Sequence, residues 1–175
     1  DVDSAKLKAS MVGRSKAMRN YMKSIMSDEC PWCVVSASTV GWAKRLYPEL
    51  NDEEAYLKLW DQILSACRST GDDPVAEWEE HIKVLDEKAK FLHENELVKL
   101  HIKNDLGTDL YVGLPKNHIW QSAGSYAKKA DRFVANIPTE EVFTMPHKDV
   151  TSGIVYNAKP LNYSGVLIDN FWLKF

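Results

Sequence analysis

The side chains best suited to chemistry lie in one segment, residues 136–147, which reads NIPTEEVFTMPH. It contains two adjacent carboxylates, Glu140 and Glu141. On an extended segment successive side chains point to opposite faces, so only one of the two carboxylates can line a given site. The pattern does not choose between them, because their companions Val142 and Phe143 are both apolar. Both could also be solvated charges in a turn, since acidic residues are mostly exposed.

Common signatures of other enzyme classes are missing from the sequence. It has no glycine-rich loop of the phosphate-binding kind, no His-Glu-x-x-His helix and no serine elbow flanked by glycines. The segment 136–147 is therefore the main candidate for a site.

Cys30-Pro31-Trp32-Cys33 has the spacing of a redox motif. In thioredoxin-like proteins this motif lies where a strand ends and a helix begins, because the helix N-terminus lowers the thiol pKa. Here a helical pattern comes first, and residues 32–35 are predicted to form a buried strand. We therefore expect ordinary core cysteines, with a dithiol redox protein as an alternative. A zinc site would need a fourth ligand besides these two and Cys67, and no second paired spacing supplies one.

Residues 1–96 are predicted to form a helical segment with one short strand. A helical pattern begins almost at residue 1, without a cap, with apolar residues from Leu7 to Ile25 at helical spacing, and a short helix is expected over 39–46. The next helix begins at Asn51 or Asp52 and stops at Gly71, and the last begins after Asp73, which makes an antiparallel pair. His81 and His93 fall on polar faces and are expected to be solvated. The predicted core stripes are Leu57, Trp60, Leu64 and Cys67 on the first of these helices and Val75, Trp78, Ile82, Leu85, Ala89 and Leu92 on the second.

Residues 97–175 are predicted to be β-rich and to carry the polar segment. Apolar and polar residues alternate over 98–103 and again over 109–114, and the intervening turn completes a hairpin. Further strands are expected at 154–156 and 166–173. An N-terminal helical block followed by antiparallel β hairpins predicts an α+β fold, because alternating βαβ units are absent.

Composition excludes several classes of protein. The 22 basic and 25 acidic residues give a net charge of -3, without long runs of one sign, so a nucleic-acid partner is not expected. No apolar stretch approaches the roughly 20 residues of a membrane span, so no membrane association is expected. Three cysteines argue against a disulfide scaffold and favour a reducing, cytoplasmic compartment.

Several blocks of the sequence resemble the aminopeptidase T/S family of metallo-aminopeptidases, which includes the PepS-like enzymes. They appear in the family's order and spacing and extend over nearly the whole chain. The blocks are DPVAEWEEH at 73–81, GTDL at 107–110, VGLPKNHIW at 112–120, NIPTEEVFT at 136–144 and YNAKPLNY at 156–163.

The resemblance implies a cytoplasmic, homodimeric exopeptidase that removes N-terminal residues from peptides through a water activated by two divalent metal ions, whether zinc, cobalt or magnesium. It also assigns Glu141 as the first metal ligand, because related sequences can have glycine at the position before this glutamate. Glu140 then becomes a partner that does not itself bind the metal, or a solvated charge. A carboxylate that bridges two ions suits this chemistry, since its two oxygens can hold both ions around one water.

The family's other ligands, a second Glu, two His, a Tyr and an Asp, lie beyond Phe175. The chain is accordingly expected to be an internal fragment of a larger two-domain enzyme and to be inactive by itself. His118 and Trp120 could face a substrate cleft or simply close the hairpin. His147 is expected to be a surface histidine rather than a ligand. The competing hypothesis is a noncatalytic α+β interaction or dimerisation module that uses exposed aromatic residues near Trp120 and Trp172.

Overall fold

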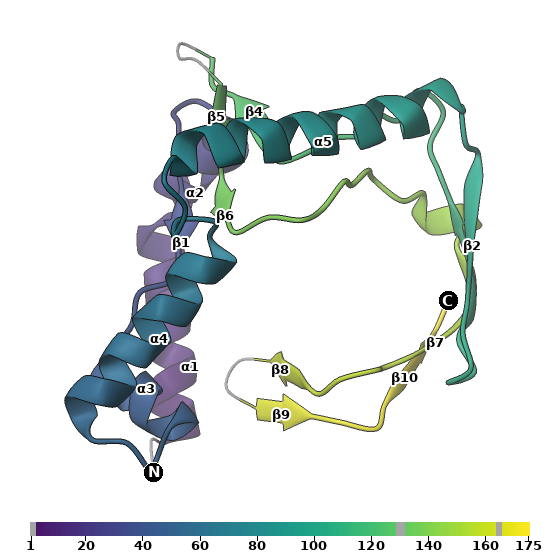
Figure 1. The fold of residues 1–175 in the computed structure, drawn as a ribbon. Helices are drawn as coiled ribbons and strands as arrows, with labels where there is room; N and C mark the ends of the chain where they lie inside the picture. The colour runs from purple at the N-terminus through teal and green to yellow at the C-terminus, as the bar shows by residue number, and fades with distance from the viewer. Residues whose placement is uncertain (1–2, 129–131, 164–165) are drawn as a thin grey trace. The chain divides into compact units, whose positions relative to one another are not determined.

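The structure is a computed structural model that describes residues 3–128, 132–163 and 166–175. The described residues contain helices and mostly antiparallel strand pairs, which confirms the predicted α+β class (Figure 1). The residues form two compact units. The first contains Asp1–Leu85 and Ser122–Glu141, and the second contains Asp86–Gln121 and Val142–Phe175. No helix of the described residues is long and apolar enough to cross a membrane.

The first unit holds most of the helices. They are α1 (Ser4–Ala17), α2 (Arg19–Met26), α3 (Val40–Leu46), α4 (Asp52–Ala66) and the beginning of α5 (Pro74–Glu94), which continues into the second unit. The helix predicted at the start of the chain is divided at Met18. Its expected lack of a cap is wrong, because the Asp3 carboxylate accepts a hydrogen bond from the Ala5 amide. Asn51 caps α4 through a capping box with Glu54.

The core of the first unit is a stripe of small and medium side chains where α3 packs on α4. It differs from the predicted stripe, because Leu57 is 53% exposed and Leu64 is also exposed. Small residues on the two facing helices allow a close approach, and this approach selects the face of α4 that is buried. The buried residues are Ala43, Ala55, Leu59, Ile63 and Cys67.

The end of α4 and the packing of α5 also differ from the expectation. Helix α4 stops at Cys67, and Arg68 follows in the left-handed conformation with a φ of 53°, so Gly71 is not the stop. Asp73 caps α5 as predicted, by accepting from the Ala76 amide. The predicted antiparallel packing of α5 along α4 is wrong for the described residues, in which α4 packs on α3. Helix α5 buries Leu85 and Ala89 as expected, whereas Val75 is 69% exposed.

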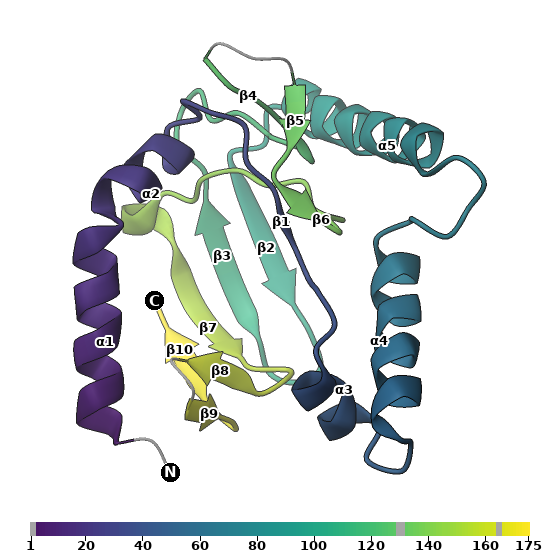
Figure 2. The same ribbon diagram turned by 90° about the vertical axis from the view of Figure 1, so that its left-hand side faces the viewer.

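Two small pairs of strands complete the first unit. Strand β1 (Val34–Val35) runs parallel to β6 (Asn136–Ile137), and the two lie side by side in Figure 2. Strand β4 (Gly124–Tyr126) pairs antiparallel with β5 (Arg132–Val134). The predicted burial of the segment 32–35 is wrong at both valines, which are exposed. The expected core cysteines Cys30 and Cys33 are exposed as well, because β1 is paired at its edge but not covered.

The second unit contains a four-stranded antiparallel sheet in the order β10-β7-β3-β2. Strands β2 (Lys99–Lys103) and β3 (Asp109–Gly113) form the predicted hairpin, and β7 is Ser152–Tyr156. The single strand predicted over 166–173 is two strands. One is β9 (Val166–Ile168), which pairs with β8 (Leu161–Tyr163), and the other is β10 (Trp172–Lys174), which pairs with β7. A short 3-10 helix, η1 (Lys148–Val150), precedes β7.

Residues 136–141 of the polar segment belong to the first unit, although they follow the β2–β3 hairpin in sequence, and residues 142–147 belong to the second unit. Strand β6 holds residues 136–141 in the first unit by pairing with β1, and the Ile137 side chain packs against the α3–α4 core. The boundary between segments 1–96 and 97–175 stays a prediction, since a compact unit and a sequence segment are different divisions of the chain.

Candidate functional site

The two carboxylates predicted as the centre of chemistry follow directly after β6. Residues 138–141 form an irregular segment that begins at a cis peptide bond between Ile137 and Pro138. Thr139 is buried, while Glu140 and Glu141 are exposed. The partly buried Ile137 and the buried Thr139 anchor the segment, and the adjacent carboxylates extend from it.

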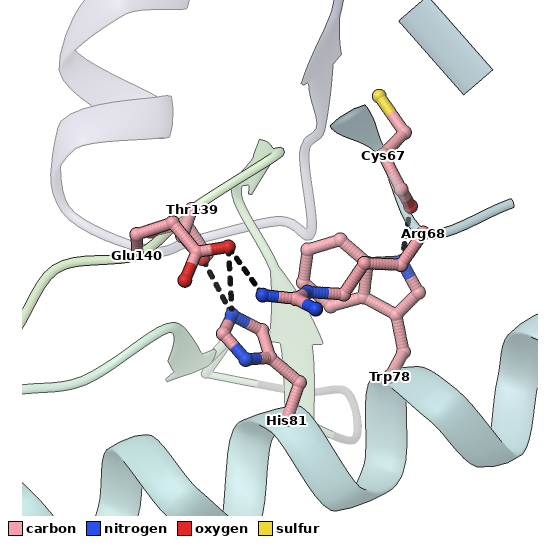
Figure 3. Close-up of polar contacts among 6 residues, drawn as sticks. All are labelled: Cys67, Arg68, Trp78, His81, Thr139 and Glu140. Carbon is pink, nitrogen blue, oxygen red and sulfur yellow. Dashed lines mark hydrogen bonds and ion pairs between the residues drawn. The ribbon is translucent and has the colours of Figure 1, made fainter. Parts of the chain in front are cut away.

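Glu140 is held by two basic side chains. Its Oε1 lies 2.7 Å from Arg68 Nη2 and 3.5 Å from His81 Nε2 (Figure 3). The carboxylate side chain remains 63% exposed and that of Arg68 39% exposed, so water screens the ion pair. Glu140 is therefore already engaged within the protein, and its assignment as a partner of the metal ligand stays a prediction.

His81 lies inside this cluster, and the prediction that it is solvated is wrong. Its side chain is only 10% exposed. Nε2 lies 2.7 Å from the Thr139 carbonyl oxygen, and because a carbonyl only accepts, Nε2 carries the proton and donates. The Trp78 ring meets the imidazole edge to face at 5.5 Å. His93, near the end of α5, is exposed as predicted.

The position of Arg68 follows from the way α4 ends. Its left-handed φ of 53° turns the chain immediately after the helix, and the Trp78 indole donates a 2.8 Å hydrogen bond to the carbonyl of the preceding Cys67. Left-handed backbone is unfavourable for a residue with a Cβ, so the surrounding contacts must impose it. Arg68 Nε is buried and has no hydrogen-bond partner among the described residues.

Glu141 differs from its neighbour in having no such contacts. It is exposed, and within the described parts of the chain its carboxylate makes no hydrogen bond or ion pair. A shallow surface hollow surrounds it, lined by Asn136, Pro138, Thr139, Glu140 and Glu141 itself. Both oxygens of Glu141 are thus available to an external cation.

The described residues do not form a complete metal site. They contain no group of three or more His, Cys, Asp or Glu side chains placed to hold an ion. Catalytic zinc sites generally use at least three protein ligands. Among the described residues, Glu141 can therefore be at most one member of such a ligand set.

His118 and Trp120 lie in the second unit, in the loop after β3. His118 Nδ1 bonds the Pro115 carbonyl at 3.0 Å, and the His118 and Trp120 rings meet edge to face at 5.9 Å. His118 also lines a cavity of about 560 Å³, whereas Trp120 does not. Their predicted role in substrate binding stays a prediction. The other residues that line the cavity are His93, Glu96, Leu97, Val98, Leu114, Pro115, Lys116 and Asn117.

His147 has a local structural role in the same unit. Its Nδ1 accepts from the Asp149 amide at 3.3 Å and caps η1, and its side chain is half-buried. The expectation that His147 is a surface histidine rather than a ligand stays a prediction.

Arg68 was missed by sequence reasoning, and His81 was assigned to the wrong environment. Arg68 is 72 positions from Glu140, and His81 is 58 positions from Thr139. No local pattern connects residues at such separations. The available signal was the resemblance itself, since one of its blocks ends at His81.

Comparison with known proteins shows to which family the chain belongs. The family model described as thermophilic metalloprotease (M29) matches residues 1–175. This chain belongs to the M29 family. Aminopeptidase AmpS of Bacillus subtilis is 42% identical over 99% of the chain, and Aminopeptidase T of Thermus aquaticus is 41% identical over 93%. These findings confirm the resemblance to aminopeptidases T and S.

A solved structure supports the same relationship for the fold. Wild-type AmpT from Thermus thermophilus superposes over 99% of the M29 chain with a TM-score of 0.88 at 33% identity. The chain covers 42% of the AmpT structure and likewise 42% of the B. subtilis relative. It thus spans less than half the length of the proteins that it matches.

Proposed function

We propose that this chain is part of a cytoplasmic, homodimeric metallo-aminopeptidase that hydrolyses N-terminal residues from peptides, with Glu141 as one ligand of two divalent ions. The relatives named as aminopeptidases support the substrate class. The single observation that carries the site is the contrast between Glu140, engaged by Arg68 and His81, and Glu141, whose oxygens are available. The free cysteines support a reducing compartment.

The metal ions, when bound, supply Lewis acidity and an activated water for attack on the peptide carbonyl. The contribution of this chain is to offer a carboxylate on a segment anchored in a helical core. Because one carboxylate cannot hold a catalytic ion, we expect the 175 residues to be inactive in isolation. Activity then requires ligands from further sequence of the kind present in the longer relatives.

The test is hydrolysis of a small panel of aminoacyl peptides with added cobalt, zinc or magnesium. It compares this chain, a form extended to the length of the relatives, and the extended form carrying Glu141→Gln. Activity in the extended form alone, lost on the Glu141→Gln change, is the expected result. Turnover by the 175-residue chain after rigorous purification would contradict the fragment assignment.

A second candidate is a noncatalytic interaction module, favoured by the apolar surface of the β8–β9 hairpin. Tyr163, Val166 and Leu167 are each more than 60% exposed. An exposed group of this kind is typical of a contact surface. Absence of activity in the extended form, together with concentration-dependent self-association in sedimentation, would favour this function over the peptidase.

A further inference from the structure

The residues around Glu140 form a connected support for the segment that presents Glu141. Arg68 follows the last turn of α4, and His81 lies in the second turn of α5. They meet two consecutive residues, because His81 bonds the Thr139 backbone while Arg68 bonds the Glu140 side chain (Figure 3). The segment leading into Glu141 is thus held through the Thr139 backbone carbonyl and through the neighbouring Glu140 side chain, whereas the Glu141 side chain has no such contact.

Trp78 joins the two halves of this support. Its indole N–H bonds the Cys67 carbonyl, next to Arg68, and its ring packs against the His81 imidazole. Cys67 is itself 3% exposed and belongs to the α3–α4 core. Contacts therefore run without interruption from the core to Thr139 and Glu140. Such a support restricts the directions in which the next side chain can point.

We infer that Arg68 and His81 are positioning residues, which fix Thr139 and Glu140 so that the Glu141 carboxylate is pre-organised for a divalent cation. The inference rests on the proposed function of Glu141 and extends it to side chains from both helices. Hydrogen-bond partners that orient a metal ligand commonly change metal affinity by about 10- to 100-fold when they are removed.

Electrostatics and positioning predict opposite effects for the loss of Arg68. Removing a guanidinium leaves the Glu140 charge unbalanced next to Glu141, and the extra negative charge by itself strengthens cation binding. Loss of the positioning contact weakens binding instead. A decrease in metal affinity would therefore be specific evidence for positioning.

Arg68→Gly is the variant of choice, because glycine accepts the left-handed φ of 53° without strain. The matched control is Lys83→Ala, which removes an exposed ion pair with Glu80 on the same helix as His81. In the extended form, cobalt affinity is measured by competition with a chelator, the visible spectrum of the bound cobalt is recorded, and the melting temperature is measured in parallel.

We expect Arg68→Gly to weaken cobalt binding by about 10-fold and to alter the cobalt spectrum, with the control unchanged. Affinity within twofold of the parent, or tighter binding, would overturn the inference. If Arg68→Gly does not fold, two variants of His81 test the inference instead. His81→Leu, which cannot donate to Thr139, is expected to weaken binding, and His81→Gln, whose amide can donate, is expected to restore part of it. Equal affinities for these two variants would likewise overturn it.

Glu141→Gln in the same assay separates the two proposals. If it abolishes cobalt binding while Arg68→Gly has no effect, the inference fails and the function stands. If Glu141→Gln binds cobalt like the parent, the proposed site itself is wrong.

Discussion

Two clusters in this chain pair a histidine with a carboxylate, and they are built in different ways. In the second unit, His101 on β2 bonds Asp109 on β3 at 2.8 Å and stacks on Tyr111 with ring centres 4.0 Å apart. In the first unit, His81 and Glu140 belong to a helix and an irregular segment far apart in sequence. The hairpin pair is local and exposed on both sides, whereas His81 is nearly enclosed. The His101–Asp109 pair lies on the exposed surface of a hairpin. The His81–Glu140 pair connects a candidate ligand segment to the helix α5.

The strongest test of this difference is truncation of each histidine. We expect His81→Ala to lower the free energy of unfolding by about 2 kcal/mol, because it removes a mostly buried ring and leaves the Thr139 carbonyl without its donor. His101→Ala is the matched control, with an expected change of about 0.5 kcal/mol, since its partners stay in water. Urea unfolding measures both. Equal losses for the two variants would contradict the distinction.

Trp78 offers a smaller effect on the same cluster. Trp78→Phe keeps an aromatic ring beside His81 but removes the indole donor to the Cys67 carbonyl, and we expect a loss of about 1 kcal/mol. Trp42→Phe on α3 is the control, because Trp42 is 41% exposed and its expected loss is about 0.5 kcal/mol or less. Unfolding by urea again provides the values. An unchanged free energy of unfolding for Trp78→Phe would show that the hydrogen bond from α5 to the end of α4 does not stabilise the protein.

The hairpin cluster is expected to respond to acid. The hydrogen bond from His101, followed by the contacts with Lys103, lowers the pKa of Asp109 below its usual value. A carboxylate with a lowered pKa in the folded state adds stability above its unfolded pKa of about 4 and loses it as the pH falls through the folded pKa. Below a pH of about 4, the free energy of unfolding should therefore fall more steeply with decreasing pH for the parent than for Asp109→Asn. The same pH dependence in both proteins would show that the His101–Asp109 pair does not contribute to stability.

The smallest expected effect is on the rate at which Cys67 is labelled. This rate reports how often the core beside the His81–Glu140 cluster opens to solvent. Cys67 is 3% exposed, and burial raises the pKa of its thiol, so we expect it to react slowly with iodoacetamide. The exposed Cys30 and Cys33 serve as internal controls that react quickly. Mass spectrometry follows the three sites, and His81→Ala should speed labelling of Cys67 alone. Fast labelling of Cys67 in the parent protein would mean that the core opens readily.

The parts of the fold that sequence could predict are those fixed by neighbours in the chain. Alternation over 98–103 and 109–114 predicted the β2–β3 hairpin, and the acidic cap at Asp73 predicted the start of α5. The buried face of α4 could not be predicted in this way. Its selection depends on Ala43 of α3, so the larger Leu57 and Leu64 remain outside. Contacts between helices, and not hydrophobic size, determine which stripe is buried.

The candidate site shows the same limit. Its acidic segment was found in the sequence, and the resemblance to the M29 aminopeptidases supplied the choice of Glu141. Periodicity could not separate the two glutamates, because the difference between them arises from Arg68 and His81. These residues contact the segment through tertiary structure, in which β6 pairs with β1 and the chain turns left-handed at Arg68.

The most direct test of this account is divalent-metal binding by the form extended to the length of the relatives, with Glu141→Gln and Glu140→Gln compared in parallel. Cobalt affinity measured by chelator competition should fall by about 100-fold or more for Glu141→Gln and by about 10-fold or less for Glu140→Gln, which removes a supporting contact rather than a ligand. A larger loss for Glu140→Gln than for Glu141→Gln would contradict the assignment of Glu141 as the metal ligand.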